Sequence, residues 1–465
     1  MTDFTYAVDA DGVATIAWDV PGKSMNVMSM AGFQELSDLV DKALGDAAVK
    51  GIIITSGKKD FAGGMDLNVL ARMKAEAGDN PAKGVFDGIM SMHHGLRKIE
   101  RAGMDPKTLK GGKPIAAALP GTALGIGLEL PLACHRIFAA DNPKAKIGLP
   151  EIKVGIFPGG GGTTRVVRTL GAMMAAPIIL EGKMFDPKKA KANGLVDEVV
   201  PADELLARAK DWVLSAKDAD IVKPWDQKGY KLPGGAPYTP QGFQTFLGAA
   251  AMVHGQTWGA FPAAKALLSA VYEGAMVPFD TALKIEARWF THVIMNPSSS
   301  AMIRSLFINK EALEKGANRP SVPDQTVKKV GVLGAGMMGA GIAYVSAMAG
   351  IQVVLIDSTQ EAADRGKSYS TGLLDKAISR KQSTEEKKAE VLGRILATTD
   401  YAALAGCDLI VEAVFEDPKV KAEVTAKAEA VIPEDAIFAT NTSTLPISSL
   451  ATASTRPEQF IGIHF

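Results

Sequence analysis

The chain has 465 residues, 47% hydrophobic and 22% charged, which is enough apolar material for two or three globular domains. Its 51 Lys and Arg balance 51 Asp and Glu, so no basic excess exists to bind nucleic acid or an acidic membrane. The two cysteines supply neither a disulfide framework nor a metal cluster, so we expect a cytoplasmic location and no bound metal. We find no secretory signal, and the apolar window 114–134 is broken by Pro, Gly and a glutamate, so we expect no integral membrane segment.

Strand and helix patterns alternate in the first part of the chain. β-branched runs predict the strands Val13–Trp18, Gly51–Ser56 and 114–119, and apolar residues at helical spacing predict a helix over 31–44. From about 185 to 321, Ala, Leu and Lys dominate, which predicts helices, and the proline-bearing segment 316–325 is typical of a linker.

A second α/β pattern follows the linker. It predicts five strands, at Lys329–Leu333, 353–357, 408–415, 436–440 and 460–465. Alternation of this kind indicates α/β domains on both sides of a helical segment. We therefore divide the chain into an α/β core at 1–190, a helical segment and linker at 191–325, and an α/β dinucleotide-binding domain at 326–465.

Two glycine-rich loops mark a candidate site in the first α/β core. In DFAGGMDL, Gly63 and Gly64 permit a turn that leaves the Met65 N–H free, and in TALGIGLEL the Ile126 N–H opens a predicted helix. Two such backbone donors form an oxyanion hole, which can stabilise the enolate of a thioester by several kcal/mol.

Two glutamates accompany these loops. Glu129 lies one helical turn after Ile126 in an apolar stretch, and Glu151 follows a strand-like run. Carboxyl groups in such surroundings should have raised pKa values, which suits proton transfer near neutral pH. Each glutamate could equally cap a helix or pair with an arginine such as Arg165. The adjacent His93 and His94 face different sides of a predicted helix, and we interpret them as structural or solvent-exposed.

These motifs resemble the crotonase, or enoyl-CoA hydratase, superfamily over about residues 1–200, through DFAGGMDL, PGTALGIGLELPLACHRIFA, IGLPEIKVGIFPGGGGTTR and GLVDEVV. The resemblance implies a crotonase-like α/β spiral fold, with the Met65 and Ile126 amides holding the thioester oxygen of an acyl-CoA. It further implies that Glu129 orients and deprotonates the water added to the 2,3 double bond, while Glu151 delivers a proton to C2. The family usually has glycine where this chain has Ile126, which would strain the backbone only at a positive φ.

The sequence KKVGVLGAGMMGAGIA carries a dinucleotide-binding fingerprint between a predicted strand and a predicted helix. Its glycines permit a tight turn, a close approach of backbone to pyrophosphate, and packing of helix on strand. Asp357 ends the next strand, where a carboxylate can bind a ribose 2′-hydroxyl and repel a 2′-phosphate, so NAD is favoured over NADP. The cofactor-binding residues predicted here are Gly334, Gly336, Met337, Met338, Gly339 and Asp357.

Polar residues follow the later strands of this Rossmann-like domain, and they include Glu416, Asn441, Ser443 and His464. A lone strand-end histidine fits a structural role, and NTST fits a helix-capping turn. Together, beside a nicotinamide, they indicate a base and a hydroxyl that handle an alcohol proton.

The motifs GAGMMGAGIA, VEAVFED, NTST and GIHF resemble the 3-hydroxyacyl-CoA dehydrogenase family across 327–465. The resemblance implies that His464 is the general base, that Ser443 binds the substrate oxygen, and that Glu416, Lys421 and Asn441 contribute to the cofactor site. The family continues past GIHF into a glutamate that pairs with the histidine and a helical domain, whereas this sequence stops at Phe465. We therefore expect NAD binding and little or no dehydrogenase turnover.

A hydratase unit joined to a dehydrogenase unit resembles the multifunctional fatty-acid β-oxidation enzymes. That resemblance implies hydration of 2-trans-enoyl-CoA to 3-hydroxyacyl-CoA, an oligomeric assembly and a thiolase partner. Two alternatives stay open at this point. The chain could be a 3,2-enoyl-CoA isomerase, although such relatives commonly retain only the second glutamate, or it could be a non-catalytic fragment that binds acyl-CoA and NAD.

Overall fold

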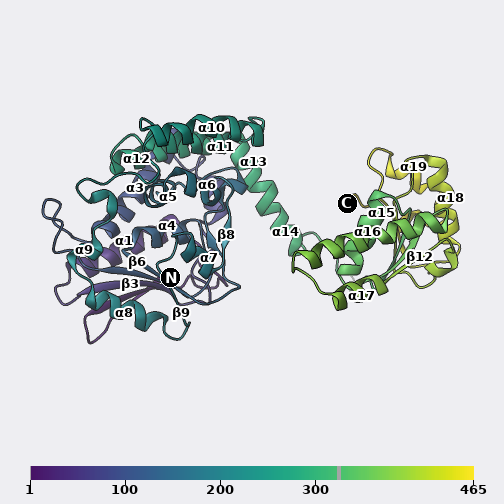
Figure 1. Cartoon of the computed structure of the whole chain (residues 1–465), viewed down its shortest axis with the longest axis horizontal. Helices are drawn as coiled ribbons and strands as arrows, with labels where there is room; N and C mark the ends of the chain where they lie inside the picture. Colours follow the sequence, from purple (N-terminus) through teal and green to yellow (C-terminus); the bar gives the residue numbers. More distant parts are fainter. Residues whose placement is uncertain (1, 322–325) are drawn as a thin grey trace. The chain divides into compact units, whose positions relative to one another are not determined.

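The computed structural model describes residues 2–321 and 326–465. It contains two compact units, Met1–Arg319 and Pro320–Phe465, each of which is described by itself (Figure 1). Part of the predicted linker, 322–325, lies outside the described residues.

The first unit is built on a six-stranded sheet in which only the first strand is antiparallel to its neighbour. In spatial order the strands are β1 (Phe4–Val8), β2 (Val13–Trp18), β3 (Gly51–Ser56), β4 (Ile115–Leu119), β6 (Arg136–Ala140) and β9 (Glu198–Val200). A smaller three-stranded sheet contains β5 (Ala123–Leu124), β7 (Ile147–Gly148) and β8 (Met184–Phe185).

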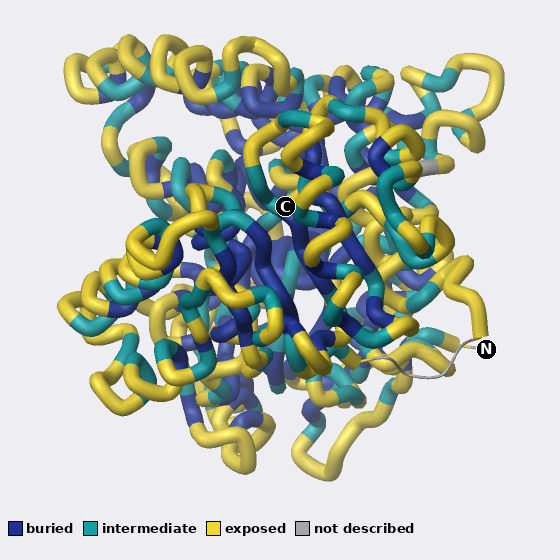
Figure 2. Tube along the Cα trace, turned by 90° about the vertical axis from the view of Figure 1, so that its right-hand side faces the viewer, coloured by how far each residue is buried: buried dark blue, intermediate teal, exposed yellow. Residues whose placement is uncertain are grey.

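Strand β3 shows why this sheet consists of continuous apolar runs rather than alternating ones. Ile52 and Ile54 belong to the main hydrophobic core, whereas Ile53 packs on the opposite face with Leu205 and Val213 of helix α8 (Leu205–Ser215). A parallel strand covered on both faces needs apolar side chains in both directions. Figure 2 colours the trace by burial and shows buried segments in dark blue among exposed helices and loops in yellow.

The helices of the first unit cover both faces of the sheet. In chain order the remaining ones are α1 (Met30–Gly45), α2 (Leu67–Arg72), α3 (Pro81–Arg101), α4 (Ile126–Ala133), α5 (Gly162–Leu170), α6 (Ala172–Ile179), α7 (Pro187–Ala192), α9 (Asp218–Ile221), α10 (Pro240–Thr257), α11 (Pro262–Gly274), α12 (Phe279–Met295), α13 (Pro297–Ile303) and α14 (Lys310–Glu314). Two 3₁₀ turns, η1 (Glu151–Val154) and η2 (Pro224–Asp226), and the π-helical turn η3 (Arg304–Asn309) complete this unit.

The α/β prediction for this unit is confirmed, although several of its strands were not predicted. The predicted strands correspond to β2, β3 and β4, and the predicted helix 31–44 corresponds to α1. The strands β1, β5, β6, β8 and β9 were not predicted. The expectation that 185–321 is helical is wrong at β9, because this three-residue strand is too short to show a pattern and is held by its pairing with β6.

The helical segment after residue 190 packs on the α/β core rather than beside it. Leu267 of α11 and Phe290 and Val293 of α12 belong to the same hydrophobic cluster as Ile52 and Ile126. Residues on both sides of position 190 therefore share one core.

The second unit contains a six-stranded parallel sheet. Its strands in spatial order are β12 (Ile395–Thr398), β11 (Gln352–Ile356), β10 (Lys329–Leu333), β13 (Leu409–Glu412), β14 (Ile437–Thr440) and β15 (Phe460–Gly462). Its helical elements are α15 (Met337–Met348), α16 (Gln360–Ser379), α17 (Glu385–Gly393), η4 (Tyr401–Leu404), α18 (Pro418–Glu429), α19 (Ile447–Ala451) and η5 (Pro457–Gln459). The five predicted strands are confirmed, although β13 and β15 are shorter than predicted.

Because all these strands are parallel, their carboxyl ends lie along one edge of the sheet, where ligands bind in folds of this kind. Within residues 2–321 and 326–465, no helix is both long and apolar enough to span a membrane. No group of three or more His, Cys, Asp or Glu in the same ranges is placed to hold a metal ion.

A buried ion pair joins α3 to α5 in the first unit. Arg165 Nε donates to Glu100 Oε1 at 2.8 Å, and both side chains are fully buried. Arg97 Nη1 donates to the other oxygen of Glu100 at 3.0 Å.

We expect Glu100→Ala to lower the free energy of unfolding of the first unit by about 3–5 kcal/mol, because it leaves the Arg165 charge buried without its carboxylate. Urea unfolding followed by tryptophan fluorescence reports on this unit alone, since all five tryptophans lie in it. The control Glu76→Ala breaks an exposed pair with Arg72 and should cost less than about 1 kcal/mol. Equal effects of the two variants would contradict this prediction.

Candidate functional site

The two glycine-rich loops of the first unit lie side by side. Gly64 has a φ of +113° and Gly125 a φ of +56°. A Cβ on Gly125 would lie 3.6 Å from the Gly64 Cα, and one on Gly64 would lie 3.4 Å from the Leu124 carbonyl oxygen. Glycine is favoured at both positions because of the positive φ, and the two loop backbones lie in van der Waals contact.

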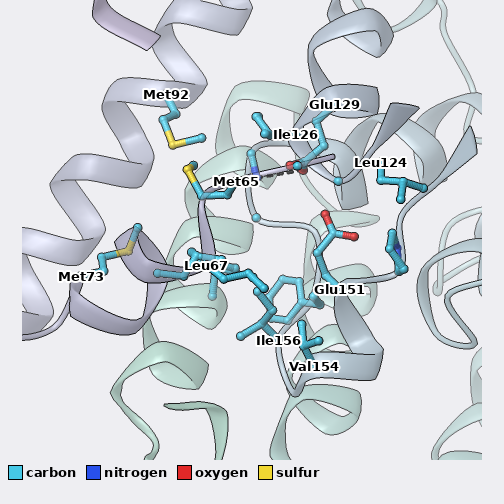
Figure 3. Close-up of a pocket in the computed structure, with 18 of the residues that line it drawn as sticks. Met65, Leu67, Met73, Met92, Leu124, Ile126, Glu129, Glu151, Val154 and Ile156 are labelled. Carbon is cyan, nitrogen blue, oxygen red and sulfur yellow. Dashed lines mark hydrogen bonds between the residues drawn. The ribbon is translucent and has the colours of Figure 1, made fainter. Parts of the chain in front are cut away.

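This arrangement leaves two backbone donors free. Among the described residues, neither the Met65 nor the Ile126 N–H has a hydrogen-bond acceptor. Ile126 is the first residue of α4, and the positive φ falls on Gly125 before it, so the isoleucine causes no backbone strain. Both residues line a cavity of about 120 Å³ (Figure 3).

Glu129 lies one turn into α4, a helix in which every residue is buried. Its Oε1 accepts hydrogen bonds from the Gly160 and Gly162 amides, both at 2.8 Å. Burial raises the pKa of Glu129 to about 7, against the opposing effect of those two hydrogen bonds and of the Arg165 charge.

Glu151 begins the turn η1 and lines the same cavity as Glu129. In Figure 3 the two carboxyl groups point into the space between them. The buried Oε2 of Glu151 has no hydrogen-bond partner among the described residues. Burial and the neighbouring charge of Glu129 raise the pKa of Glu151 well above its ordinary value.

The rest of the cavity wall is largely apolar. It includes Leu67, Leu70, Met73, Ile89, Met92, Leu124, Val154, Ile156, Phe157, Phe290 and Phe307. The structure thus brings Met65, Ile126, Glu129 and Glu151 together around one mostly apolar cavity.

The structural alternative that pairs one of these glutamates with Arg165 does not hold, because Arg165 bonds to Glu100. His93 is buried, and its Nε2 lies 2.7 Å from the Gly159 carbonyl oxygen. Burial lowers the pKa of His93 to about 3. His94 is exposed. Their predicted structural or solvent-exposed placement is confirmed.

A third buried carboxyl group, Glu286 of α12, was not predicted from the sequence. Its oxygens accept hydrogen bonds from Gly161 N at 2.6 Å, Thr164 N at 2.8 Å and Thr164 Oγ1 at 2.6 Å. Burial and the charge of Glu129 raise the pKa of Glu286 to about 8. The sequence did contain a signal for it. Glu286 lies between Ala282 and Phe290 on the apolar face of the helix, and a single acid on such a face needs a hydrogen-bonding partner.

The fingerprint glycines of the second unit form the expected turn between β10 and α15. Gly334 has a φ of +92°, and a Cβ on Gly339 would lie 1.7 Å from the Gly334 carbonyl oxygen. A Cβ on Gly336 would meet nothing within 4 Å, so this glycine faces open space. Asp357 Oδ2 accepts a hydrogen bond from Ala335 N at 2.7 Å, which places the carboxylate beside the turn.

The first amides of α15 fit a pyrophosphate. The N–H groups of Gly336, Met337 and Met338 have no acceptor among the described residues. Free amides at a helix N-terminus favour an anionic ligand, and the open side of Gly336 lets one approach. The residues present therefore fit a dinucleotide.

The strand-end residues are connected by hydrogen bonds. Glu416 Oε1 accepts from Ser443 N at 3.1 Å and from Thr442 Oγ1, and Asn441 Oδ1 accepts from Phe465 N at 2.9 Å. Burial alone would raise the pKa of Glu416, but the bonds from Thr442 and Lys421 outweigh it and lower the pKa to about 2. Glu416 thus holds the turn that carries Ser443.

Lys421 is buried, and its Nζ donates to both oxygens of Glu412 at 2.9 and 3.0 Å and lies 3.2 Å from Glu416. His464 and Ser443 are both exposed. The roles of Lys421, Ser443 and His464 stay predictions.

Two family models match this chain, each within one compact unit. Residues 9–220 match enoyl-CoA hydratase/isomerase, and residues 329–465 match the NAD-binding domain of 3-hydroxyacyl-CoA dehydrogenase. The two matched regions contain the motifs from which a hydratase-like α/β core and an NAD site were predicted.

Curated relatives span both units. The fatty acid oxidation complex subunit alpha of Shewanella frigidimarina is 35% identical over 465 residues, 99% of this chain and 63% of that protein. The same-named protein of Shewanella baltica is 34% identical over 458 residues, 98% of this chain and 62% of that protein. This chain therefore spans less than two thirds of the length of these relatives. Among solved structures, human mitochondrial delta3-delta2-enoyl-CoA isomerase is 20% identical with a TM-score of 0.46, covering 68% of this chain and 100% of that one.

The raised carboxyl pKa values predict a pH-dependent stability for the first unit. Glu129, Glu151 and Glu286 keep their protons in the folded state to higher pH than in the unfolded chain. The unfolded chain therefore binds fewer protons, and the free energy of unfolding should fall as pH rises from 6.5 to 8, at about 1.4 kcal/mol per pH unit for each proton. His93 and His135, whose pKa values burial lowers to about 3, affect stability only below about pH 6.5.

Urea unfolding by tryptophan fluorescence at pH 6.5 and at pH 8 measures this slope. Glu286→Gln should make it shallower, because one of the titrating groups is gone. Stability that is constant or rises over this interval would refute the assignment.

Proposed function

Given that this chain joins an enoyl-CoA hydratase/isomerase domain to the NAD-binding domain of a 3-hydroxyacyl-CoA dehydrogenase, we propose that it acts in fatty-acid β-oxidation and hydrates 2-trans-enoyl-CoA to 3-hydroxyacyl-CoA. One observation carries this proposal: two free backbone amides and two carboxyl groups line a single cavity.

In the proposed reaction the Met65 and Ile126 amides hold the thioester oxygen and stabilise the enolate that forms as water adds to C3. Glu129 takes the proton of the attacking water, and Glu151 gives a proton to C2. A C3–O bond and a C2–H bond form. The C2–C3 π bond, one O–H bond of water and the O–H bond of Glu151 break, and the water proton passes to Glu129.

The surroundings of the two acids support this division of roles. The two amides on Glu129 stabilise its ionised form, which a base needs. Glu151 has no such donors on Oε2, and burial and the Glu129 charge raise its pKa, so it keeps its proton to higher pH than an ordinary glutamate, as an acid needs.

We expect Glu129→Gln and Glu151→Gln each to lower kcat for hydration of crotonyl-CoA by about 10²–10⁴-fold, because each removes one proton-transfer group. The loss of crotonyl-CoA absorbance measures the rate. The control Glu181→Gln removes an exposed carboxylate paired with Lys183 and should leave the rate unchanged.

The two alternatives give different results in the same assay. A wild-type chain that does not hydrate crotonyl-CoA but moves the double bond of a 3-enoyl-CoA, with Glu129→Gln still active, would be an isomerase. A chain that binds the thioester with no turnover of either substrate would be a non-catalytic acyl-CoA-binding protein.

For the second unit we propose that the β10–α15 turn binds the NAD pyrophosphate and that Asp357 binds the adenosine ribose. Bound NAD would supply a hydride acceptor. His464 would take the proton of the 3-hydroxyl group, and Ser443, held by Glu416, would bind the same oxygen. The further contacts to the cofactor are assigned to Gly334, Met337, Met338, Gly339, Lys421 and Asn441.

Gly336→Ala should weaken NADH binding at least about tenfold, because its Cβ would occupy the space through which a pyrophosphate approaches. The substitution should not disturb folding, since the Cβ meets no protein atom within 4 Å. Gly341→Ala is the matched control in the same helix, where a Cβ also meets nothing, and it should leave binding unchanged. Titration of NADH fluorescence measures both, and equal affinity of Gly336→Ala and wild type would contradict the proposed site.

The partners and location are proposed on the relatives' names and on the composition. We propose an oligomeric assembly, because the relatives are named as subunits of a fatty acid oxidation complex. The thiolase partner rests on the resemblance to the multifunctional β-oxidation enzymes. A cytoplasmic location is consistent with the cysteine content.

A further inference from the structure

The loop Gly159–Gly162 is held by side chains from three different helices. Its carbonyl at Gly159 meets His93 Nε2 of α3, its amides at Gly160 and Gly162 donate to Glu129 of α4, and its amide at Gly161 donates to Glu286 of α12. Consecutive amides of one loop thus bond alternately to two buried carboxyl groups.

Only glycine allows these contacts. A Cβ on Gly159 would lie 2.2 Å from Phe290 Cδ2, and one on Gly162 would lie 2.6 Å from Glu129 Oε1. Gly161 has a φ of +94°, and a Cβ there would lie 2.0 Å from Arg165 Nη1. Because the loop has no side chains, Glu129 of α4 and Glu286 of α12 can both reach its backbone.

We propose that Glu286 is a positioning residue for the hydratase: by holding Gly161 and Thr164 it fixes the two amides that orient Glu129 toward Glu151. The inference rests on the proposed hydratase function and assigns to it a residue from the helical segment. Glu286 itself does not line the cavity, so it acts through the loop and not on the substrate.

The contacts of Glu286 suit an anchor. It accepts three hydrogen bonds, from Gly161 N, Thr164 N and Thr164 Oγ1, and these three donors favour its ionised form. Both oxygens are used, so the carboxylate bridges the end of the loop to the first turn of α5. Loss of one oxygen acceptor would free Gly161 or Thr164 and let the loop shift, and displacements of about 1 Å can cost about 10²-fold in rate.

Glu286 also acts electrostatically. The charged and titratable groups around it are Glu129 of α4, Glu151 of η1, Arg165 of α5 and His93 of α3, whose Nε2 lies 3.7 Å from Glu286 Oε1. Above its own pKa of about 8, Glu286 carries a negative charge that raises the pKa of Glu151 and helps that residue keep its proton.

Glu286→Gln tests both effects, because glutamine keeps the shape but places an NH₂ group opposite one of the donors and removes the charge. We expect kcat for crotonyl-CoA hydration to fall about 10- to 100-fold with KM within about twofold of wild type, since the oxyanion donors are untouched. The alkaline limb of the kcat–pH profile should move to lower pH, because Glu151 loses the neighbouring charge that raises its pKa.

Glu273→Gln is the matched control. Glu273 of α11 bonds to Arg288 and Trp289 of α12, so its loss weakens the docking of the same helix without touching the loop. It should leave kcat and the pH profile unchanged. Thermal unfolding of each variant shows whether the fold is kept.

Thr164→Val is a second variant that removes only one donor to Glu286. Without that hydrogen bond the pKa of Glu286 rises, so the alkaline limb should move in the same direction as in Glu286→Gln, by a smaller amount. If the wild-type chain hydrates crotonyl-CoA and both variants match Glu273→Gln in kcat and pH profile, the inference is overturned. If the wild-type chain itself does not hydrate crotonyl-CoA, the proposed function fails first.

Discussion

The candidate site of the first unit depends on one interaction, in which the amides of Gly160 and Gly162 donate to the same oxygen of the buried Glu129. Burial alone would keep Glu129 protonated, and a protonated acid cannot accept a proton from water. The amides of Gly160 and Gly162 favour the charged form and offset that burial, so that the pKa settles at about 7. The site needs both effects, because the apolar wall makes the group basic and the loop keeps it ionisable.

The two units solve the same structural problem with similar local structures. Each must present backbone N–H groups to a ligand without a side chain in the way, and each places a glycine of positive φ, Gly125 or Gly334, ahead of a helix. The donors then belong to rigid elements, since Ile126 begins α4 and Met337 begins α15. Preorganised donors lose little freedom when a ligand binds, and this suits them to the enolate proposed for the first unit and to the pyrophosphate proposed for the second.

Local signals account for what could be predicted. The buried parallel strands β3 and β10 are continuous apolar runs, and the loops around Gly64 and Gly336 are rich in glycine. Each of these patterns lies within about ten consecutive residues, so it could be recognised from the local sequence. Strand β9 has three residues and exists through its pairing with β6, which no local pattern records. Glu286 was missed for a related reason. Its partners Gly161 and Thr164 lie 125 and 122 residues away, and only the tertiary fold brings them to α12.

The helical segment after residue 190 therefore belongs physically to the core of the first unit. Glu286 supplies the acceptor for the Gly161 and Thr164 donors, and without it these buried groups would lose hydrogen bonds that apolar surroundings cannot replace. Phe290 and Phe307, from α12 and the π-helical turn, complete the cavity wall. A core ending at 190 would expose that wall to water, and water would stabilise both carboxylates and return their pKa values toward those of ordinary acids. The segment thus creates the conditions under which the two glutamates can exchange protons.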